Sequence, residues 1–335
     1  MLINGIKTFA GKRVAVIGDL VADQFLNGKI SRVSREAPVF ILRHDETDTR
    51  PGGAANAAAN IAALGGVPLV VGLVGDDANG ELLKRSLEAA NVKTDAGSVI
   101  AAPGVQTTTK VRVVAGQHYA ARQQVIRIDY ENRKEIDSEV LRRVAEGAEK
   151  ACRAADAIVV SDYGYGVVTQ ELFDIAQQIA KERQIPLIVD SRFRLDQFLG
   201  ATSATPNQEE AEHILGRDLN DPDCKALRER LDVEALLITR GNSGMTLIEK
   251  GKDVLHISAV GSSEPVDVTG AGDTVIAAYA LSIAAGMSFA DAAAVANHAG
   301  GIVVMKKGTA TASIDELKTS IETHSRLTET ASPSN

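Results

Sequence analysis

The sequence is poor in cysteine and has no cluster of histidines. Only Cys152 and Cys224 occur among its 335 residues, and nothing near either is typical of a metal or redox pair. Two free thiols in a reducing cytosol are the simplest interpretation, although one bridge would agree with the count. The six histidines show no ligand spacing, which argues against a structural zinc site.

Basic runs and long apolar runs are also missing. The formal net charge is -8 without a cluster of Lys and Arg, so nucleic acid is not an expected partner. A small anionic substrate remains open, because a few convergent Arg side chains suffice. The longest apolar stretch, about residues 275–287, is shorter than the ~20 residues of a membrane-spanning helix. The N-terminus is not typical of a signal peptide. We therefore expect a cytoplasmic protein without a membrane contact.

What is present is an alternation of strand and helix patterns. Short apolar runs at residues 14–17, 69–74, 157–160, 186–189 and 235–238 alternate with helix-period stretches such as 79–90, 138–153 and 170–181. This order predicts an α/β fold with a doubly wound, mostly parallel sheet covered by helices on both faces. We expect one domain over residues 1–325, followed by a polar tail at 326–335.

Two segments interrupt this alternation. Residues 24–43 and 106–127 are rich in Val, Ile and Thr, with turn residues at Gly28 and Gly116, and they predict antiparallel strand pairs. We expect them, within about residues 24–50 and 104–128, to form a small β lid over the carboxyl edge of the main sheet, where ligands bind. The exposed edge of such a lid favours a homodimer.

The strongest motif is Asp-Val-Thr-Gly-Ala-Gly-Asp at residues 267–273, directly before an apolar helix. The small residues Gly270, Ala271 and Gly272 let backbone amides approach an anion, and the helix adds partial positive charge at its start. Asp273 lies in the same turn. Phosphoryl transfer needs this pairing of an anion hole with a carboxylate that accepts the nucleophile's proton. The alternative for Asp273 is a simple helix cap.

Two further motifs follow predicted strands and suit a nucleotide. Asn207 and Glu210 have the spacing of a helix-capping pair, and the same residues would suit the magnesium-bound phosphates through water. Both interpretations can hold together. The second motif is either a charged hairpin turn or a triphosphate site, and it supplies Thr239, Arg240, Gly241 and Gly244. We assign Asn297 to the same nucleotide site.

A third group of residues suits sugar hydroxyls. Gly52 and Gly53 open an Ala-rich helix in which Asn56 lies on one face with Asn60, and buried amides need partners. Carboxylates that follow strands accept hydrogen bonds from vicinal hydroxyls. Asp19 is the preferred candidate over Asp23, which we expect to face solvent, and Asp162 and Asp190 follow strands at the same edge.

In their order, these motifs resemble the ribokinase family of sugar kinases over nearly the whole chain. The resemblance implies ATP and Mg²⁺ as cofactors and Asp273 as the base. It also implies that the amides of residues 270–273 form the anion hole and that Glu210 contacts Mg²⁺ through water. Family members often respond to a monovalent cation such as K⁺ near the position of Asp267.

A narrower resemblance is to the heptose 7-phosphate kinases of ADP-heptose synthesis, carried by residues 31–39, 50–56, 127–131, 161–163 and 308–311. It implies phosphorylation of the anomeric 1-hydroxyl of D-glycero-β-D-manno-heptose 7-phosphate for lipopolysaccharide core synthesis. Fused members carry a second domain with a His-x-Gly-His signature. That signature is not in this sequence, so we expect the stand-alone kinase. Three departures from the pattern are Arg35, Tyr165 and the pair Ser191 and Arg192, of which Arg192 would substitute for a usual Lys.

A sugar phosphate also needs cations remote from the transferred group, and the lid segments supply six: Arg32, Arg35, Lys110, Arg112, Arg122 and Arg127. Strand alternation sends about half inward, and our choice is Arg32 and Arg122. Two other functions remain open. One is a kinase of an unphosphorylated sugar or a nucleoside. The other is a non-catalytic sugar-phosphate sensor, which the intact base and anion hole disfavour.

Overall fold

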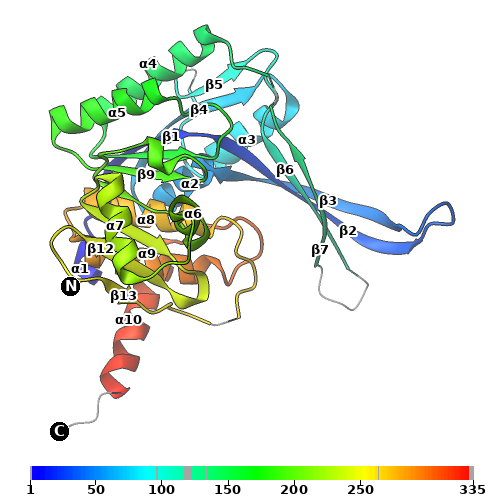
Figure 1. Cartoon of the computed structure of the whole chain (residues 1–335). Coiled ribbons are helices and arrows are strands. Elements are labelled where there is room, and N and C mark those ends of the chain that lie inside the picture. Colours follow the sequence, from blue (N-terminus) through cyan, green and yellow to red (C-terminus); the bar gives the residue numbers. More distant parts are fainter. Residues whose placement is uncertain (1, 96, 117–122, 133, 263, 332–335) are drawn as a thin grey trace.

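The computed structural model describes residues 2–95, 97–116, 123–132, 134–262 and 264–331, which form a layered body and a projecting β arm (Figure 1). The body contains a nine-stranded sheet in the order β13-β12-β11-β10-β9-β8-β1-β4-β5. Every neighbouring pair from β11 to β5 is parallel, whereas the pairs β11–β12 and β12–β13 are antiparallel. The strands are β1 (Arg13–Gly18), β4 (Val67–Gly75), β5 (Val99–Ala102), β8 (Ala157–Asp162), β9 (Leu187–Ser191), β10 (Ser203–Ala204), β11 (Ala235–Thr239), β12 (Met245–Glu249) and β13 (Leu255–Ile257).

Helices cover both faces of this sheet, as predicted. They are α1 (Leu2–Ile6), α2 (Ala54–Ala63), α3 (Ala78–Ala89), α4 (Ser138–Ala154), α5 (Gln170–Arg183), α6 (Gln208–Leu215), α7 (Asp221–Leu231), α8 (Ala271–Ala284), α9 (Phe289–Val303) and α10 (Ile314–Ala331). The last helix reaches Ala331, and thus extends into the segment expected to be a polar tail. No helix in the described ranges has both the length and the apolar character to cross a bilayer.

Strand alternation explains why the core lies on both faces of the sheet. Val14 and Val16 of β1 point toward the layer that contains α2, α8 and α9. Their neighbours Ala15 and Ile17 point the opposite way, into the core built with α4 and α5. A strand buried on both faces is apolar throughout, so its polar residues gather after its last position. The polar residues after β1, β8 and β9 therefore lie together at the carboxyl edge of the sheet.

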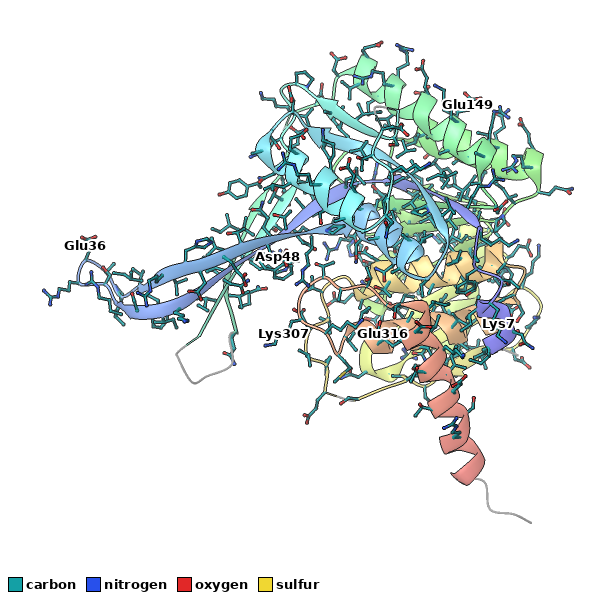
Figure 2. The ribbon with its side chains drawn as sticks, turned by 180° about the vertical axis from the view of Figure 1, so that it is seen from behind. Lys7, Glu36, Asp48, Glu149, Lys307 and Glu316 are labelled. Atoms are coloured by element: carbon teal, nitrogen blue, oxygen red, sulfur yellow. The ribbon has the colours of Figure 1, made fainter. Side chains whose placement is uncertain are left out.

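The β arm is the predicted lid. It is a second sheet in the order β3-β2-β6-β7, with β2 (Leu20–Val33), β3 (Phe40–Gly53), β6 (Thr109–Gly116) and β7 (Gln123–Tyr130). The two predicted antiparallel pairs, β2-β3 and β6-β7, are both present. They are joined side by side by parallel pairing of β2 with β6. Figure 2 labels Glu36 at the far tip of the β2–β3 hairpin and Asp48 nearer the body.

The predicted turn at Gly28 is wrong. The strand β2 continues through Gly28, and the chain turns later, where the Ser34 amide donates to the Val39 carbonyl at 2.8 Å. The register with β3 shifts between Asn27 and Gly28, and a Cβ at Gly28 would lie 2.8 Å from the Arg43 carbonyl oxygen. The glycine thus marks a strand irregularity with close backbone approach rather than a turn. Gly116 ends β6, and the connection after it lies outside the described residues.

Candidate active site

The Asp273 carboxylate lies buried in the first turn of α8, with 3% of the residue exposed. Its Oδ1 accepts a hydrogen bond from the Tyr163 hydroxyl at 2.5 Å, and its Oδ2 accepts one from Asn56 Nδ2 at 2.9 Å. Burial raises the pKa of Asp273 to about 6, although both hydrogen bonds act to lower it. A carboxylate with this pKa is ionised at neutral pH and is basic enough to accept a proton.

The turn before Asp273 contains the residues predicted to form an anion hole. Gly270 has φ 76°, and a Cβ there would lie 2.5 Å from Asn56 Nδ2, so only glycine fits. The Ala271 amide donates to the Val268 carbonyl at 3.2 Å. The amides of Gly272 and Asp273 have no acceptor within the described part of the chain. Of the predicted anion-hole amides, these two therefore remain available to a ligand, and they lie at the positive end of the helix dipole.

Asp267 joins this turn to a distant loop. Its Oδ1 accepts from the Thr269 amide at 3.0 Å, and its Oδ2 accepts from the Gly308 amide at 2.9 Å. Burial acts to raise the pKa of Asp267, but these hydrogen bonds outweigh it and lower the pKa overall. Asp267 is therefore a fixed negative charge beside the anion turn, where the resemblance implied a monovalent cation.

A cavity beside the turn of Asp273 brings together three of the seven residues predicted to bind the nucleotide, namely Asn207, Glu210 and Thr239. It is lined by Asp162, Tyr163, Asp190, Arg192, Thr205, Asn207, Glu210, Thr239, Gly272 and Val275. The capping box is also present, because Asn207 Oδ1 accepts from the Glu210 amide and Glu210 Oε2 accepts from the Asn207 amide, both at 2.9 Å. Asn207 and Glu210 thus cap α6 and line the cavity at once, so the two interpretations are compatible.

The polar groups of this cavity fit a hydrated cation. The Thr205 hydroxyl is buried without a hydrogen-bond partner in the described structure, and it lines the cavity. Burial raises the pKa of Asp190 well above its ordinary value, with further repulsion from Glu210 and Asp273. Burial also raises the pKa of Glu210. Within the described ranges, no group of three metal-ligating side chains converges on one point, so these oxygens would hold Mg²⁺ mainly through its waters. Sequence analysis missed Thr205, since a Thr before Pro has no distinctive pattern.

The remaining nucleotide candidates lie beside this cavity. Thr239 lines it, whereas Arg240 Nε donates to Gln208 Oε1 at 3.2 Å. Gly241 and Gly244 form the β11–β12 connection, and a Cβ at Gly244 would lie 2.0 Å from the Ile257 carbonyl oxygen. The segment is therefore the turn of an antiparallel hairpin, and its role as a triphosphate site stays a prediction. Asn297 of α9 lies apart from the cavity lining and donates from Nδ2 to the Ser258 carbonyl at 2.7 Å.

Asp19 and the two glycines hold the site's framework. Both Asp19 oxygens accept backbone hydrogen bonds, from Tyr163, Tyr165 and Val167 at 2.7, 3.1 and 3.2 Å. Burial raises the pKa of Asp19 to about 6 despite these donors. A Cβ at Gly53 would lie 2.7 Å from the Asp19 carbonyl oxygen, and one at Gly52 would lie 2.7 Å from Asp23 Oδ2. Gly53 and Gly52 are therefore needed because a larger residue would collide with Asp19 and Asp23, respectively.

The expectation that Asp23 faces solvent is wrong. The residue is 5% exposed, its Oδ1 accepts from Arg112 Nη1 at 2.6 Å, and its Oδ2 accepts from the Thr309 hydroxyl at 2.8 Å. The partner Thr309 is remote in sequence, so no local pattern predicts the burial. Asp162 is similarly engaged, because it accepts from Ser191 Oγ at 2.6 Å and from Arg194 Nη2 at 2.5 Å.

Among the lid cations in the described ranges, Lys110 is the one that lies beside Tyr163, the hydrogen-bond partner of Asp273. Its Nζ lies 5.6 Å from the Tyr163 ring centroid, and Arg192 approaches the same ring at 5.8 Å. Burial, followed by the nearby Arg192 charge, lowers the pKa of Lys110. Arg32 is exposed near the outer end of β2, opposite Ile41, and Arg122 lies outside the described residues. The in–out alternation of side chains along a strand does not show which cation of the lid lies close enough to the body of the protein to reach the site.

Most of this chain is similar in sequence to known proteins. Residues 12–316 match the model of the pfkB family carbohydrate kinases. The bifunctional protein HldE of Vibrio parahaemolyticus is 40% identical over 311 residues, covering 91% of this chain and 62% of that protein. The bifunctional protein HldE of Desulfatibacillum aliphaticivorans is 38% identical over 323 residues, covering 95% and 64%. The chain spans less than two thirds of the length of these relatives.

Solved structures with the same fold include two sugar kinases. The ribokinase of Arabidopsis thaliana, complexed with ribose and ATP, matches with a TM-score of 0.68 and 21% identity over 93% of this chain and 98% of that one. Phosphofructokinase-2 of Escherichia coli matches with a TM-score of 0.75 and 19% identity over 95% and 100%. These likenesses show the fold, and the family match covers most of the chain. The chain therefore belongs to the pfkB family of carbohydrate kinases.

Proposed function

We propose that the protein transfers the γ-phosphoryl group of ATP to the anomeric 1-hydroxyl of D-glycero-β-D-manno-heptose 7-phosphate. The observation that carries the transfer chemistry is that the buried Asp273 carboxylate lies in the same turn of α8 as two backbone amides without an acceptor, those of Gly272 and Asp273. The heptose assignment rests on the segments that resemble heptose 7-phosphate kinases, among them residues 50–56 and 308–311. The product would be the 1,7-bisphosphate used in lipopolysaccharide core synthesis.

In this mechanism the Asp273 carboxylate accepts the proton of the sugar 1-hydroxyl while the oxygen of that hydroxyl attacks the γ-phosphorus. The bond between the γ-phosphorus and the bridging oxygen breaks, and ADP leaves with that electron pair. The amides of Gly272 and Asp273 would stabilise the charge on the transferred group. Bound Mg²⁺ would supply further charge neutralisation, and Thr205, Asp190 and Glu210 would hold it, largely through water. A monovalent cation such as K⁺ would lie near Asp267.

Two cations support a phosphorylated substrate. Lys110 comes from the lid and Arg192 from the segment after β9, and both approach the ring of Tyr163 next to Asp273. Neither side chain has a carboxylate partner within 4.0 Å among the described residues. Their charge would offset that of the two phosphate-bearing substrates. Asn56, Gly52 and Gly53 would contact the sugar, with Asp19 acting on the site through the Tyr163 loop.

The test is ATP consumption with magnesium across heptose 7-phosphate, its dephosphorylated form, fructose phosphates, ribose and adenosine. Turnover on heptose 7-phosphate alone is the expected result. A preference for an unphosphorylated sugar would overturn the substrate while leaving the sugar kinase intact, and Lys110 and Arg192 would then serve ATP alone.

We also propose a homodimer formed through the lid. The edge strand β7 exposes Val125 by 44% and Ile126 by 55%, and Phe40 of β3 is 55% exposed. An edge with such residues favours pairing with another strand. The measurement is the molar mass in solution. Ile126→Lys should shift the protein toward monomer, and an unchanged mass in that variant, or a monomeric wild-type protein, would contradict the proposal.

A further inference from the structure

Both oxygens of the proposed base are already occupied. The Tyr163 hydroxyl donates to Asp273 Oδ1 at 2.5 Å, and Asn56 Nδ2 donates to Oδ2 at 2.9 Å. A hydroxyl that is to be deprotonated must come within about 2.6–3.2 Å of the base. Asn56 is fully buried on α2 and also binds the Gly270 carbonyl. The phenol of Tyr163 therefore occupies the place that an acceptor hydroxyl needs.

Tyr163 lies on a loop whose backbone hydrogen bonds hold it in this position. The residue follows β8, and Asp19 binds the amides of the loop at Tyr163, Tyr165 and Val167. Gly164 and Gly166 adopt φ 79° and 94°, which side chains rarely allow. The Tyr163 residue is half-buried and lines the cavity described above, and its hydroxyl donates to Asp273 Oδ1.

The ring also contacts the elements that would surround a sugar. Lys110 of the lid lies 5.6 Å from its centroid and Arg192 lies 5.8 Å from it. A Cβ at Gly53 would lie 3.4 Å from Tyr163 Cε2. Burial raises the pKa of Tyr163 well above its ordinary value, and the Asp273 charge adds to the shift. The phenol therefore remains a hydrogen-bond donor at all working pH values, as a sugar hydroxyl is.

We propose that Tyr163 is a positioning residue that selects the acceptor, because its hydroxyl occupies Asp273 Oδ1 until a sugar hydroxyl displaces it. The inference rests on the proposed role of Asp273 as the base. With ATP bound and no sugar present, a free Asp273 oxygen would accept a proton from water and the γ-phosphoryl group would be lost to hydrolysis. The hydrogen bond from the Tyr163 hydroxyl keeps water from binding that oxygen. A sugar held by the lid and α2 competes successfully because several contacts hold it at once.

The experiment measures ATP hydrolysis without sugar in the full-length Tyr163→Phe variant. Loss of one hydrogen bond to a charged group changes an equilibrium by about tenfold or more, so sugar-independent hydrolysis should rise about tenfold over wild type. Tyr165→Phe is the matched control. Tyr165 lies in the same loop and its ring meets Lys110 at 5.7 Å, but its hydroxyl faces Glu131 at 3.5 Å rather than Asp273. Hydrolysis in this variant should equal that of wild type.

Two further readouts separate positioning from a merely structural role. The Tyr163 hydrogen bond lowers the pKa of Asp273, so the pH midpoint of hydrolysis should move upward in Tyr163→Phe. The double variant Tyr163→Phe/Asp273→Asn should lose the added hydrolysis, because that activity runs through Asp273. Tyr163→Leu tests the same point if the Phe variant has a lowered thermal unfolding midpoint.

Unchanged hydrolysis in a folded Tyr163→Phe protein would overturn the proposal, and so would a rise that persists in the double variant. An equal rise in Tyr165→Phe would also overturn it, because general loosening of the loop would then explain the effect. Since these rates are measured without sugar, they do not depend on which sugar is the substrate. Failure of heptose 7-phosphate as a substrate would therefore be seen separately.

Discussion

Asn56 of α2 holds Asp273 of α8 by a hydrogen bond of 2.9 Å between Asn56 Nδ2 and Asp273 Oδ2. The same nitrogen lies 3.2 Å from the Gly270 carbonyl oxygen. One amide group therefore fixes both the carboxylate and the turn that carries the proposed anion-binding amides. Asn60, one helical turn later, supports Asn56 by donating to its carbonyl oxygen at 3.0 Å. The Ala-rich helix α2 thus aligns the turn before Asp273 as well as packing against the sheet.

Removing this amide should impair catalysis and shift its pH dependence. The hydrogen bond from Asn56 lowers the pKa of Asp273, so Asn56→Ala should raise the pH midpoint of turnover. The loss of one charge-assisted hydrogen bond, about 1.5–3 kcal/mol, should reduce kcat/KM by roughly tenfold or more. Steady-state kinetics between pH 5 and 9 measure both effects. A fall in kcat/KM with an unmoved midpoint would show that Asn56 acts on binding alone.

Turnover should depend on the ionisation of Asp273. Burial raises the pKa of this carboxyl to about 6, and only the ionised form accepts a proton. We expect kcat to be constant at neutral pH and to fall as the pH drops through about 6. The measurement is kcat at saturating ATP and sugar phosphate, with ATP binding followed in parallel to exclude acid unfolding. A kcat that remains constant down to pH 4.5 would contradict a base with this pKa.

Asp273 should also cost the protein stability at neutral pH. Its folded-state pKa lies above the unfolded value of 3.8, so the folded state binds the proton more tightly. Its contribution to the free energy of unfolding is therefore fully favourable below about pH 4 and is lost as the pH rises through about 6. A shift of this size corresponds to about 3 kcal/mol at most. The free energy of unfolding of Asp273→Asn, compared with that of wild type, should therefore be more favourable at pH 7.5 than at pH 4. Denaturant titration of both proteins at the two pH values measures this difference.

Lys110 should matter to the phosphorylated substrate more than other lid cations. Lys110→Met should raise the KM for the sugar phosphate about tenfold or more, because a buried charge-assisted contact is lost, and should change the KM for ATP less. Arg43→Gln is the control, since Arg43 is an exposed cation of β3. An equal effect of both variants would assign the result to the general charge of the lid. A larger effect on ATP would place Lys110 on the γ-phosphate.

The sequence predicted best where local chemistry determines structure. The apolar run of β1 followed by Gly-Asp predicted a buried strand, and the glycine-rich string before α8 predicted a tight turn at the start of a helix. The capping pair Asn207 and Glu210 was also predictable, because its geometry depends on residues three positions apart. Gly28 misled the turn prediction, since glycine serves both turns and close strand approach.

Contacts between remote segments could not be predicted. The burial of Asp23 depends on Thr309, far along the chain. The position of Tyr163 on Asp273 depends on how β8 and α8 pack, and the hydroxyl of Tyr163 carries no local signal of that partner. Lys110 and Arg32 look equivalent as strand cations, and only the depth of each position in the lid separates the buried one from the exposed one.

The most direct test of the account compares wild-type protein with Asp273→Asn for transfer from ATP to heptose 7-phosphate in the presence of magnesium. The account predicts that turnover falls by a factor of about 10² or more, as expected for loss of a general base, while the Kd for ATP changes little. Turnover close to that of wild type would contradict the assignment of Asp273 as the base, and with it the proposed mechanism.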